Sequence, residues 1–103
     1  MFANFRTYQR AKELYFLISQ LKMPSFLRNQ ALRASSSVVL NLAEGRGRES
    51  VKEQRRFFVI AQGSLKETQS ILELIPNGGG DVQSKADEVG AMLFCLIRSL
   101  EAS

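Results

Sequence analysis

The sequence predicts an all-α fold, an antiparallel up-down-up-down four-helix bundle, from three observations. Apolar residues recur at alternating steps of three and four along nearly the whole chain, which is the period of one face of an α-helix. Proline, glycine and capping residues divide this pattern into four segments of similar length. Helices of similar length joined by short loops pack antiparallel around one core. The 103 residues fit one domain, residues 1–103.

The first two segments meet at Pro24. Because the residue before a proline avoids the helical conformation, the first helix is expected at residues 4–22. Its apolar stripe consists of Phe5, Tyr8, Ala11, Tyr15, Ile18 and Leu21. The second helix is expected at 25–45, with a stripe of Leu27, Ala31, Ala34, Val38, Asn41, Leu42 and Gly45. Gly45 and Gly47 are expected to end it through a residue in the left-handed conformation.

The third and fourth segments have clear start and stop signals. Ser50 followed by Glu53 is typical of a capping box, so the third helix is expected at 50–75, where Pro76 stops it. Its stripe consists of Gln54, Phe58, Ala61, Leu65, Thr68, Leu72 and Ile75. Three consecutive glycines then predict a loop, and the fourth helix is expected at 81–101. Its stripe consists of Val82, Ala86, Val89, Leu93, Leu96 and Leu100.

Charge is distributed unevenly along the chain. Residues 1–66 contain 12 Lys and Arg against 4 Asp and Glu, a net charge of +8, whereas residues 67–103 contain 2 against 6, a net charge of −4. The densest group of cations surrounds the expected turn between the second and third helices and consists of Arg46, Arg48, Lys52, Arg55 and Arg56.

This basic group has two interpretations. Arginine forks match phosphate oxygens, and a helix N-terminus at Ser50 adds partial positive charge, so the group predicts contact with RNA or DNA. Alternatively, it is a solvated surface, or it pairs with an acidic partner protein or the acidic half of another copy. Aromatic stacking does not favour either interpretation, because Phe57 and Phe58 lie on or beside the core stripes.

Several small or polar residues interrupt the apolar pattern. Ser35 to Ser37 and the pair Gly63 and Ser64 lie in the middle of helices, and these small surfaces are expected to pack against one another or against a neighbouring subunit. Asn41, Glu44 and Arg48 share one side of the second helix, and Glu67 follows Ser64 by three residues. We expect a structural polar network, with any buried carboxylate paired to a serine hydroxyl or an arginine.

The composition argues against catalysis, metals and cofactors. The chain has no histidine and a single cysteine, which removes the usual zinc sites and the imidazole base that would activate a serine. Cys95 is expected to be a small buried residue. No apolar run approaches the roughly 20 residues of a membrane span, and no signal peptide is evident. No enzymatic activity, no cofactor, no membrane contact and a cytoplasmic location are therefore expected.

One motif is specific enough to indicate a family. The string from Asn41 to Arg48, which contains Ala43-Glu44-Gly45, is its most distinctive part, and Gly63, Ser64 and Glu67 extend it. Together with the flanking residues 8–11 and 96–100, these residues resemble the four-helix bundle proteins encoded in intervening sequences of bacterial 23S ribosomal RNA genes. The resemblance covers nearly the whole chain.

The resemblance implies a homo-oligomer, typically a ring of five copies, with no established enzymatic activity. A related accessory protein of diversity-generating retroelements is similar, forms a basic five-fold ring, and binds nucleic acid and a reverse transcriptase. The resulting hypothesis is a non-catalytic homo-oligomer that binds RNA or DNA through residues 46–56, and the alternative is a protein-interaction module with no nucleic-acid role.

Overall fold

The computed structural model describes residues 2–101, with side chains from residue 6 onward. Over this range the chain forms the helices α1 (Phe2–Ser19), α2 (Ser25–Arg46), α3 (Val51–Glu73) and α4 (Asp81–Glu101), with a short 3-10 turn η1 (Pro76–Gly79) before α4. No strand occurs in this range. The predicted all-α four-helix bundle is therefore confirmed, and the expected bounds are within three residues at every helix end.

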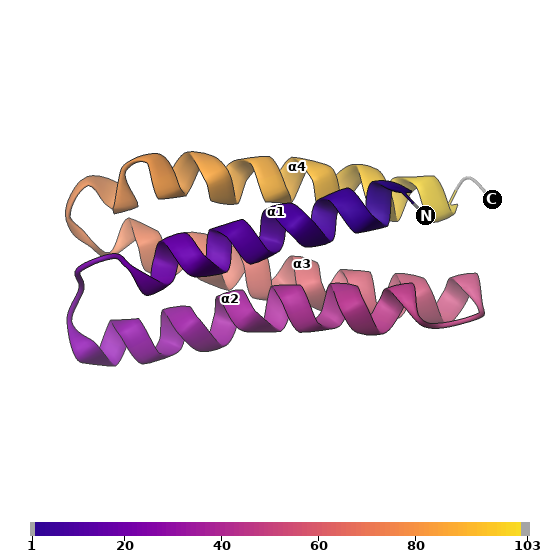
Figure 1. Cartoon of the computed structure of the whole chain (residues 1–103), viewed down its shortest axis with the longest axis horizontal. Helices are drawn as coiled ribbons and strands as arrows, with labels where there is room; N and C mark the ends of the chain where they lie inside the picture. The colour runs from indigo at the N-terminus through magenta and orange to yellow at the C-terminus, as the bar shows by residue number, and fades with distance from the viewer. Residues whose placement is uncertain (1, 102–103) are drawn as a thin grey trace.

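The helices run antiparallel in a rod of 42 × 20 × 18 Å. Each helix packs against two neighbours, in the cyclic order α1, α2, α3, α4. The α1–α2 and α3–α4 connections lie at one end of the rod, and the α2–α3 turn lies at the other end, beside the start of α1 and the end of α4 (Figure 1). Residues from three separate parts of the sequence therefore meet at the end that contains the predicted basic group.

The core is made by the predicted stripes of α2, α3 and α4 and, in α1, by the predicted Ala11 and Ile18 together with residues outside the predicted stripe. In α1 the buried residues include Leu14, which is fully buried, and Thr7, whereas Tyr8 and Tyr15 are only half-buried. The predicted α1 stripe was therefore displaced by about one residue at these positions, and Phe5 lies outside the described side chains. The largest fully buried apolar side chains are Leu14, Ile18, Leu42, Phe58, Leu65, Leu72 and Leu93.

The C-terminus of α1 lies at Ser19, three residues before the expected end. Pro24 does not terminate the helix directly. The Arg28 guanidinium on α2 donates hydrogen bonds to the carbonyl oxygens of Leu21, at 2.9 Å, and of Ser19. Because the last carbonyls of a helix have no partner within the helix, this side chain satisfies acceptors that would otherwise need water. Arg28 thus joins the end of α1 to the start of α2.

Replacing Arg28 by alanine is expected to lower the free energy of unfolding by about 1–3 kcal/mol, because two charge-assisted hydrogen bonds are lost at a partly buried site. Urea denaturation followed by circular dichroism measures the change. Arg33 is an exposed arginine on the same helix, and its replacement by alanine should change stability by less than about 0.5 kcal/mol. Similar losses for both variants would contradict this role of Arg28.

The end of α2 contains glycines for a reason other than the predicted one. The helix ends at Arg46 and is capped by Gly47, whose φ of −83° and ψ of −5° are right-handed, so the expected left-handed cap is wrong. Gly45 is buried inside the last turn. A Cβ atom there would lie 2.6 Å from Cε1 of Phe58 on α3. Gly45 is therefore required by close helix packing, and the turn closes through ordinary backbone hydrogen bonds.

The boundaries of α3 follow the predicted signals. Ser50 is the N-cap, and its hydroxyl accepts a hydrogen bond from the Glu53 amide at 3.0 Å, as the capping box predicts. The helix ends at Glu73, two residues before the expected position. The chain then turns through four consecutive residues with positive φ, Asn77 and the three glycines that follow it. Glycine tolerates this conformation without steric cost, which explains the loop composition.

Ion pairs join α1 to α4 along the outer edge of the bundle. The Lys85 ammonium contacts Glu13 at 3.1 Å and Glu88 at 3.2 Å, and Arg10 contacts Glu13 at 3.1 Å. The hydrogen bond from Lys85 lowers the pKa of Glu13, and the hydrogen bonds to Glu13 and Glu88 raise the pKa of Lys85. Glu13 and Glu88 are exposed and Lys85 is partly exposed, so these ion pairs contribute little to the free energy of unfolding.

Among residues 2–101, no helix is both long and apolar enough to cross a membrane.

Candidate nucleic-acid interface

A seam of hydroxyl and amide groups lies between α2 and α3. The Ser37 and Ser64 hydroxyls are 2.8 Å apart, and Asn41 Nδ2 donates to the Ser37 carbonyl at 2.9 Å and to its hydroxyl at 3.1 Å. The Thr68 hydroxyl donates to the Ser64 carbonyl at 2.9 Å. The predicted packing of the serine surfaces is confirmed for Ser37 and Ser64. These small residues let the two helices approach while every hydroxyl in the seam has a partner.

Other residues of the family motif lie outside this seam. Glu44 and Glu67 are both exposed, so neither is the buried carboxylate that the polar network allowed for. Glu44 instead pairs with Arg48 one turn later, at 2.6 Å. Gly63 is also exposed, and a Cβ atom added there would meet no atom within 4 Å. Its lack of a side chain is therefore unexplained by packing within the chain.

Phe57 organises two cations of the basic end. The guanidinium of Arg48 lies 4.9 Å from the centre of its ring, and that of Arg56 lies 5.0 Å from it. Both distances are within the range of cation–π attraction. Phe57 is half-buried, with its Cβ beside Gly45, and its ring lies against two arginine forks near the start of α3. Phe57 was predicted to lie on or beside the core stripes, and nothing in the sequence indicates its contact with the two arginines.

Tyr8 plays the same part on the neighbouring edge, between α1 and α2. The Lys12 ammonium lies 5.0 Å from its ring centre and the Arg46 guanidinium lies 5.1 Å from it. The spacing of four between Tyr8 and Lys12 within one helix was a signal for half of this arrangement. The contribution of Arg46 comes from another helix, so no sequence pattern could reveal it.

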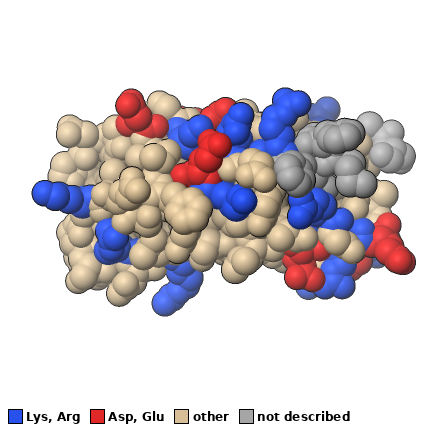
Figure 2. Space-filling model, in the orientation of Figure 1, with Lys and Arg blue, Asp and Glu red and all other residues tan. Residues whose placement is uncertain are grey.

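The five predicted cations differ in how far acidic groups neutralise them. Arg55 donates to Glu101 at the end of α4, with Nη2 at 2.9 Å and Nε at 3.2 Å from the same carboxylate oxygen. Arg48 pairs closely with Glu44, whereas Arg56 is 3.7 Å from Glu53, longer than a charge-assisted hydrogen bond. Figure 2 accordingly shows acidic and basic side chains mixed at this end of the rod.

The basic group is therefore divided rather than uniform. Arg48 and Arg55 both pair with carboxylates, but Arg55 differs in that its partner, Glu101, lies on α4. Arg48 and Arg56 converge on Phe57, and Arg46 joins Lys12 on Tyr8. Lys52 is exposed in the first turn of α3. The surface available to an anion thus runs from the first turn of α3 to the α1–α2 edge. The N-terminus of α3 adds partial positive charge at one end of this surface.

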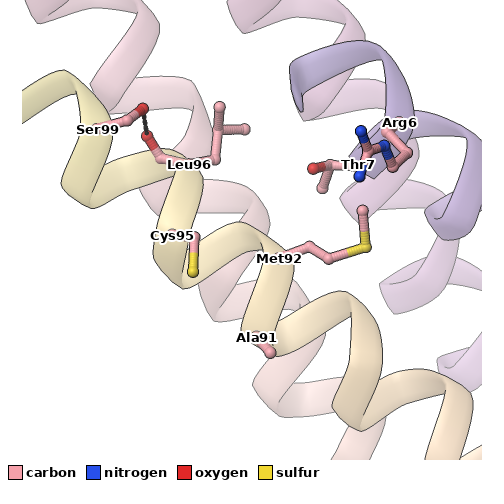
Figure 3. Close-up of a pocket in the computed structure, with 7 residues that line it drawn as sticks. All are labelled: Arg6, Thr7, Ala91, Met92, Cys95, Leu96 and Ser99. Atoms are coloured by element: carbon pink, nitrogen blue, oxygen red, sulfur yellow. Dashed lines mark hydrogen bonds between the residues drawn. The ribbon is translucent and has the colours of Figure 1, made fainter. Parts of the chain in front are cut away.

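Another hollow lies between α1 and α4, with a volume of about 480 Å³. Met92 extends from α4 toward α1, where Arg6 and Thr7 lie, and the Ser99 hydroxyl donates to the Leu96 carbonyl at 2.6 Å (Figure 3). The described residues that line this hollow are mainly apolar, and none of them is a carboxylate.

Cys95 lines this hollow and is exposed, so the expectation of a buried cysteine is wrong. The α4 stripe explains the error. Leu93 and Leu96 face the core. Because each residue of a helix is rotated by about 100° from the one before it, Cys95 points about 100° away from Leu96. Cys95 is next to the stripe in sequence but outside it on the helix surface.

The described residues also offer no cluster of three or more His, Cys, Asp or Glu side chains that could hold a metal ion. The two carboxylates of the family motif, Glu44 and Glu67, are exposed, and Glu44 is engaged with Arg48. What this surface can do chemically is bind an anion with guanidinium and ammonium groups.

Comparison with known proteins places this geometry in a family. No curated protein matches the chain. The crystal structure of a protein of unknown function from the S23 ribosomal protein family of Bacteroides thetaiotaomicron is similar, with a TM-score of 0.69 and 20% sequence identity over 92% of this chain and 94% of that one. At this identity the likeness shows the fold alone. The family model described as 23S rRNA-intervening sequence protein matches residues 3–100. The chain therefore belongs to the 23S rRNA-intervening sequence protein family.

Proposed function

We propose that this protein is a non-catalytic, homo-oligomeric bundle that binds RNA or DNA through the surface around residues 46–56. The observation that carries the proposal is the pair of arginine forks, Arg48 and Arg56, stacked on Phe57 at the N-terminal end of α3. A guanidinium held in place by a ring loses less conformational entropy on binding a phosphate than a freely rotating one. The helix N-terminus beside them favours the same anion.

A salt titration tests the proposal through the number of phosphates contacted. Log affinity should fall with log salt at a slope of about −0.9 per contact on duplex DNA or about −0.7 on single strands. Replacing Arg56 by alanine should weaken binding and reduce the slope by about one contact. Fluorescence anisotropy of a labelled RNA or DNA, measured from low to moderate salt, gives both quantities.

Arg55 provides the matched control, because it is adjacent in sequence but bound to Glu101. Its replacement by alanine should leave the salt slope unchanged. No binding by the unaltered protein at low salt would reject nucleic-acid contact altogether, and equal effects of both replacements would reject the division of the basic group.

The homo-oligomeric part of the proposal is supported by apolar side chains on the outside of the bundle. Val59 and Ile60 on α3 are 38% and 41% exposed. Phe94 on α4 is 52% exposed. Surfaces of this kind fit contacts between subunits. A ring is the proposed assembly, with five copies as the expected number, and the native mass from analytical ultracentrifugation tests it.

The alternative is a protein-interaction module, in which the basic half meets an acidic partner or the acidic half of another copy. It is favoured by the pairing of Arg55 with Glu101, because this contact already joins the basic and acidic halves within one chain. On that view, charge reversal at Arg55 and Arg56 changes the native mass or partner capture and leaves nucleic acid irrelevant. Measuring mass beside the salt titration separates the two functions.

A further inference from the structure

A second, smaller hollow lies on the surface between α1 and α2, with a volume of about 210 Å³. Its walls are Tyr15 and Phe16 from α1 and Val39 and Leu40 from α2. Two of these side chains project into solvent: Phe16 is 59% exposed and Leu40 is 66% exposed. The Phe16 ring contacts Tyr15 edge to face, with centroids 5.4 Å apart and an interplanar angle of 69°. The hollow therefore offers a supported aromatic face.

A track of positive charge leads to this hollow. Lys12 lines the hollow, and its ammonium also lies 5.0 Å from the ring centre of Tyr8. The Arg46 guanidinium lies over the same ring. No carboxylate is among the described lining residues. The neighbouring Glu13 is engaged by Lys85 of α4, on the other edge of α1. Cations thus continue from the basic end of the bundle to the rim of an apolar hollow.

We propose that this hollow binds an unpaired base of single-stranded RNA or DNA, with the base against Phe16 and the adjoining phosphates on Lys12 and Arg46. The inference rests on the proposed nucleic-acid contact and specifies its substrate class. Proteins that bind single strands combine a positively charged path for the backbone with exposed aromatic rings for the bases. The α1–α2 surface has both elements. On its other side Phe16 also lines a hollow with Glu13 and Lys85, where Lys85 pairs with the Glu13 carboxylate.

The same arrangement disfavours two other occupants. A duplex keeps its bases stacked and paired inside, so it offers phosphates to Lys12 and Arg46 but no base face to Phe16. A second protein packed over this hollow would also cover Lys12, and lysine is depleted in protein interfaces. The single strand satisfies the ring and the cation together.

Replacing Phe16 by tryptophan tests the contact directly, because the chain contains no other tryptophan. Its emission should be quenched when a 12-nucleotide oligo(dT) or oligo(U) strand saturates the protein and unchanged with a duplex of equal length. Replacing Phe16 by alanine should weaken binding of the single strand by about tenfold and leave duplex binding unchanged. The tryptophan variant should retain the unaltered affinity, since the larger ring still stacks.

Phe26 is the matched control, because it is also an exposed phenylalanine, at 66%, and it lies at the start of α2, at the opposite end of the rod from the α2–α3 turn (Figure 1). Its replacement by alanine should leave single-strand binding unchanged. The inference is overturned if the Phe16→Ala variant binds the strand as well as the unaltered protein, if the tryptophan is not quenched, or if Phe16→Ala changes the native mass, which would place the ring in a subunit contact. Failure of the unaltered protein to bind any nucleic acid would instead reject the proposed function.

Discussion

Replacing Leu14 by alanine is expected to lower the free energy of unfolding by about 2–5 kcal/mol. Leu14 is fully buried in the core between α1 and its neighbours, so the substitution removes apolar contacts and leaves a cavity that a bundle of packed helices fills only in part. Urea denaturation monitored by circular dichroism measures the loss.

Leu17, on the same helix, is the control for Leu14. It is 37% exposed, and the same substitution there should have a much smaller effect. Equal losses at both positions would show that α1 does not have the register described above. The pair therefore tests the one helix whose buried face differs from the sequence prediction.

Replacing Gly45 by alanine is expected to destabilise the protein by about 1–3 kcal/mol through overpacking, despite the higher helix propensity of alanine. The added Cβ would lie 2.6 Å and 2.9 Å from Cε1 and Cδ1 of Phe58 and 3.1 Å from Cβ of Phe57. Phe58 is fully buried, so its ring would have to shift within a packed core. Thermal denaturation should show a lower midpoint.

The basic surface should also be sensitive to this substitution, because Phe57 positions Arg48 and Arg56. The control is Gly63→Ala on α3, where the new Cβ meets nothing within 4 Å of the same chain. That variant should gain about 0.5–1 kcal/mol, since alanine replaces an exposed helical glycine. A Gly45→Ala variant as stable as Gly63→Ala would contradict the close approach of α2 and α3.

Helix identity and most helix limits could be predicted because they depend on neighbours in sequence. The bounds of α4 agree at both ends, and the Ser50 cap and the start of α2 at Ser25 follow from local signals. The end of α1 could not be predicted, because Arg28 reaches Ser19 only after the chain has turned back. Gly45 was predicted to end the second helix, but a glycine near a helix end is compatible with a turn and with a close packing contact equally well.

The candidate site was predicted in part. The clustering of cations near the α2–α3 turn is visible in the sequence, whereas the partner of Arg55 lies 46 residues away, at Glu101. The stacking of Arg48 on Phe57 and of Arg46 on Tyr8 likewise joins different helices. Sequence proximity therefore indicated which charges gather and allowed the local pair of Glu44 and Arg48, whereas helix packing decided the pairing of Arg55 with Glu101 and the contacts of the cations with rings.

By itself the sequence determined the four-helix bundle, its single core and the basic character of one end, because hydrophobic period, capping and charge count are properties of the chain read in order. The tertiary structure decided the register of α1, the packing role of Gly45, the exposure of Cys95 and the aromatic supports of the arginines. These features depend on the rotation of each helix about its axis and on which side chains meet across an interface. A periodic stripe of apolar residues defines the rotation of a helix only to within about one residue, or 100°, and does not determine which side chains meet across an interface.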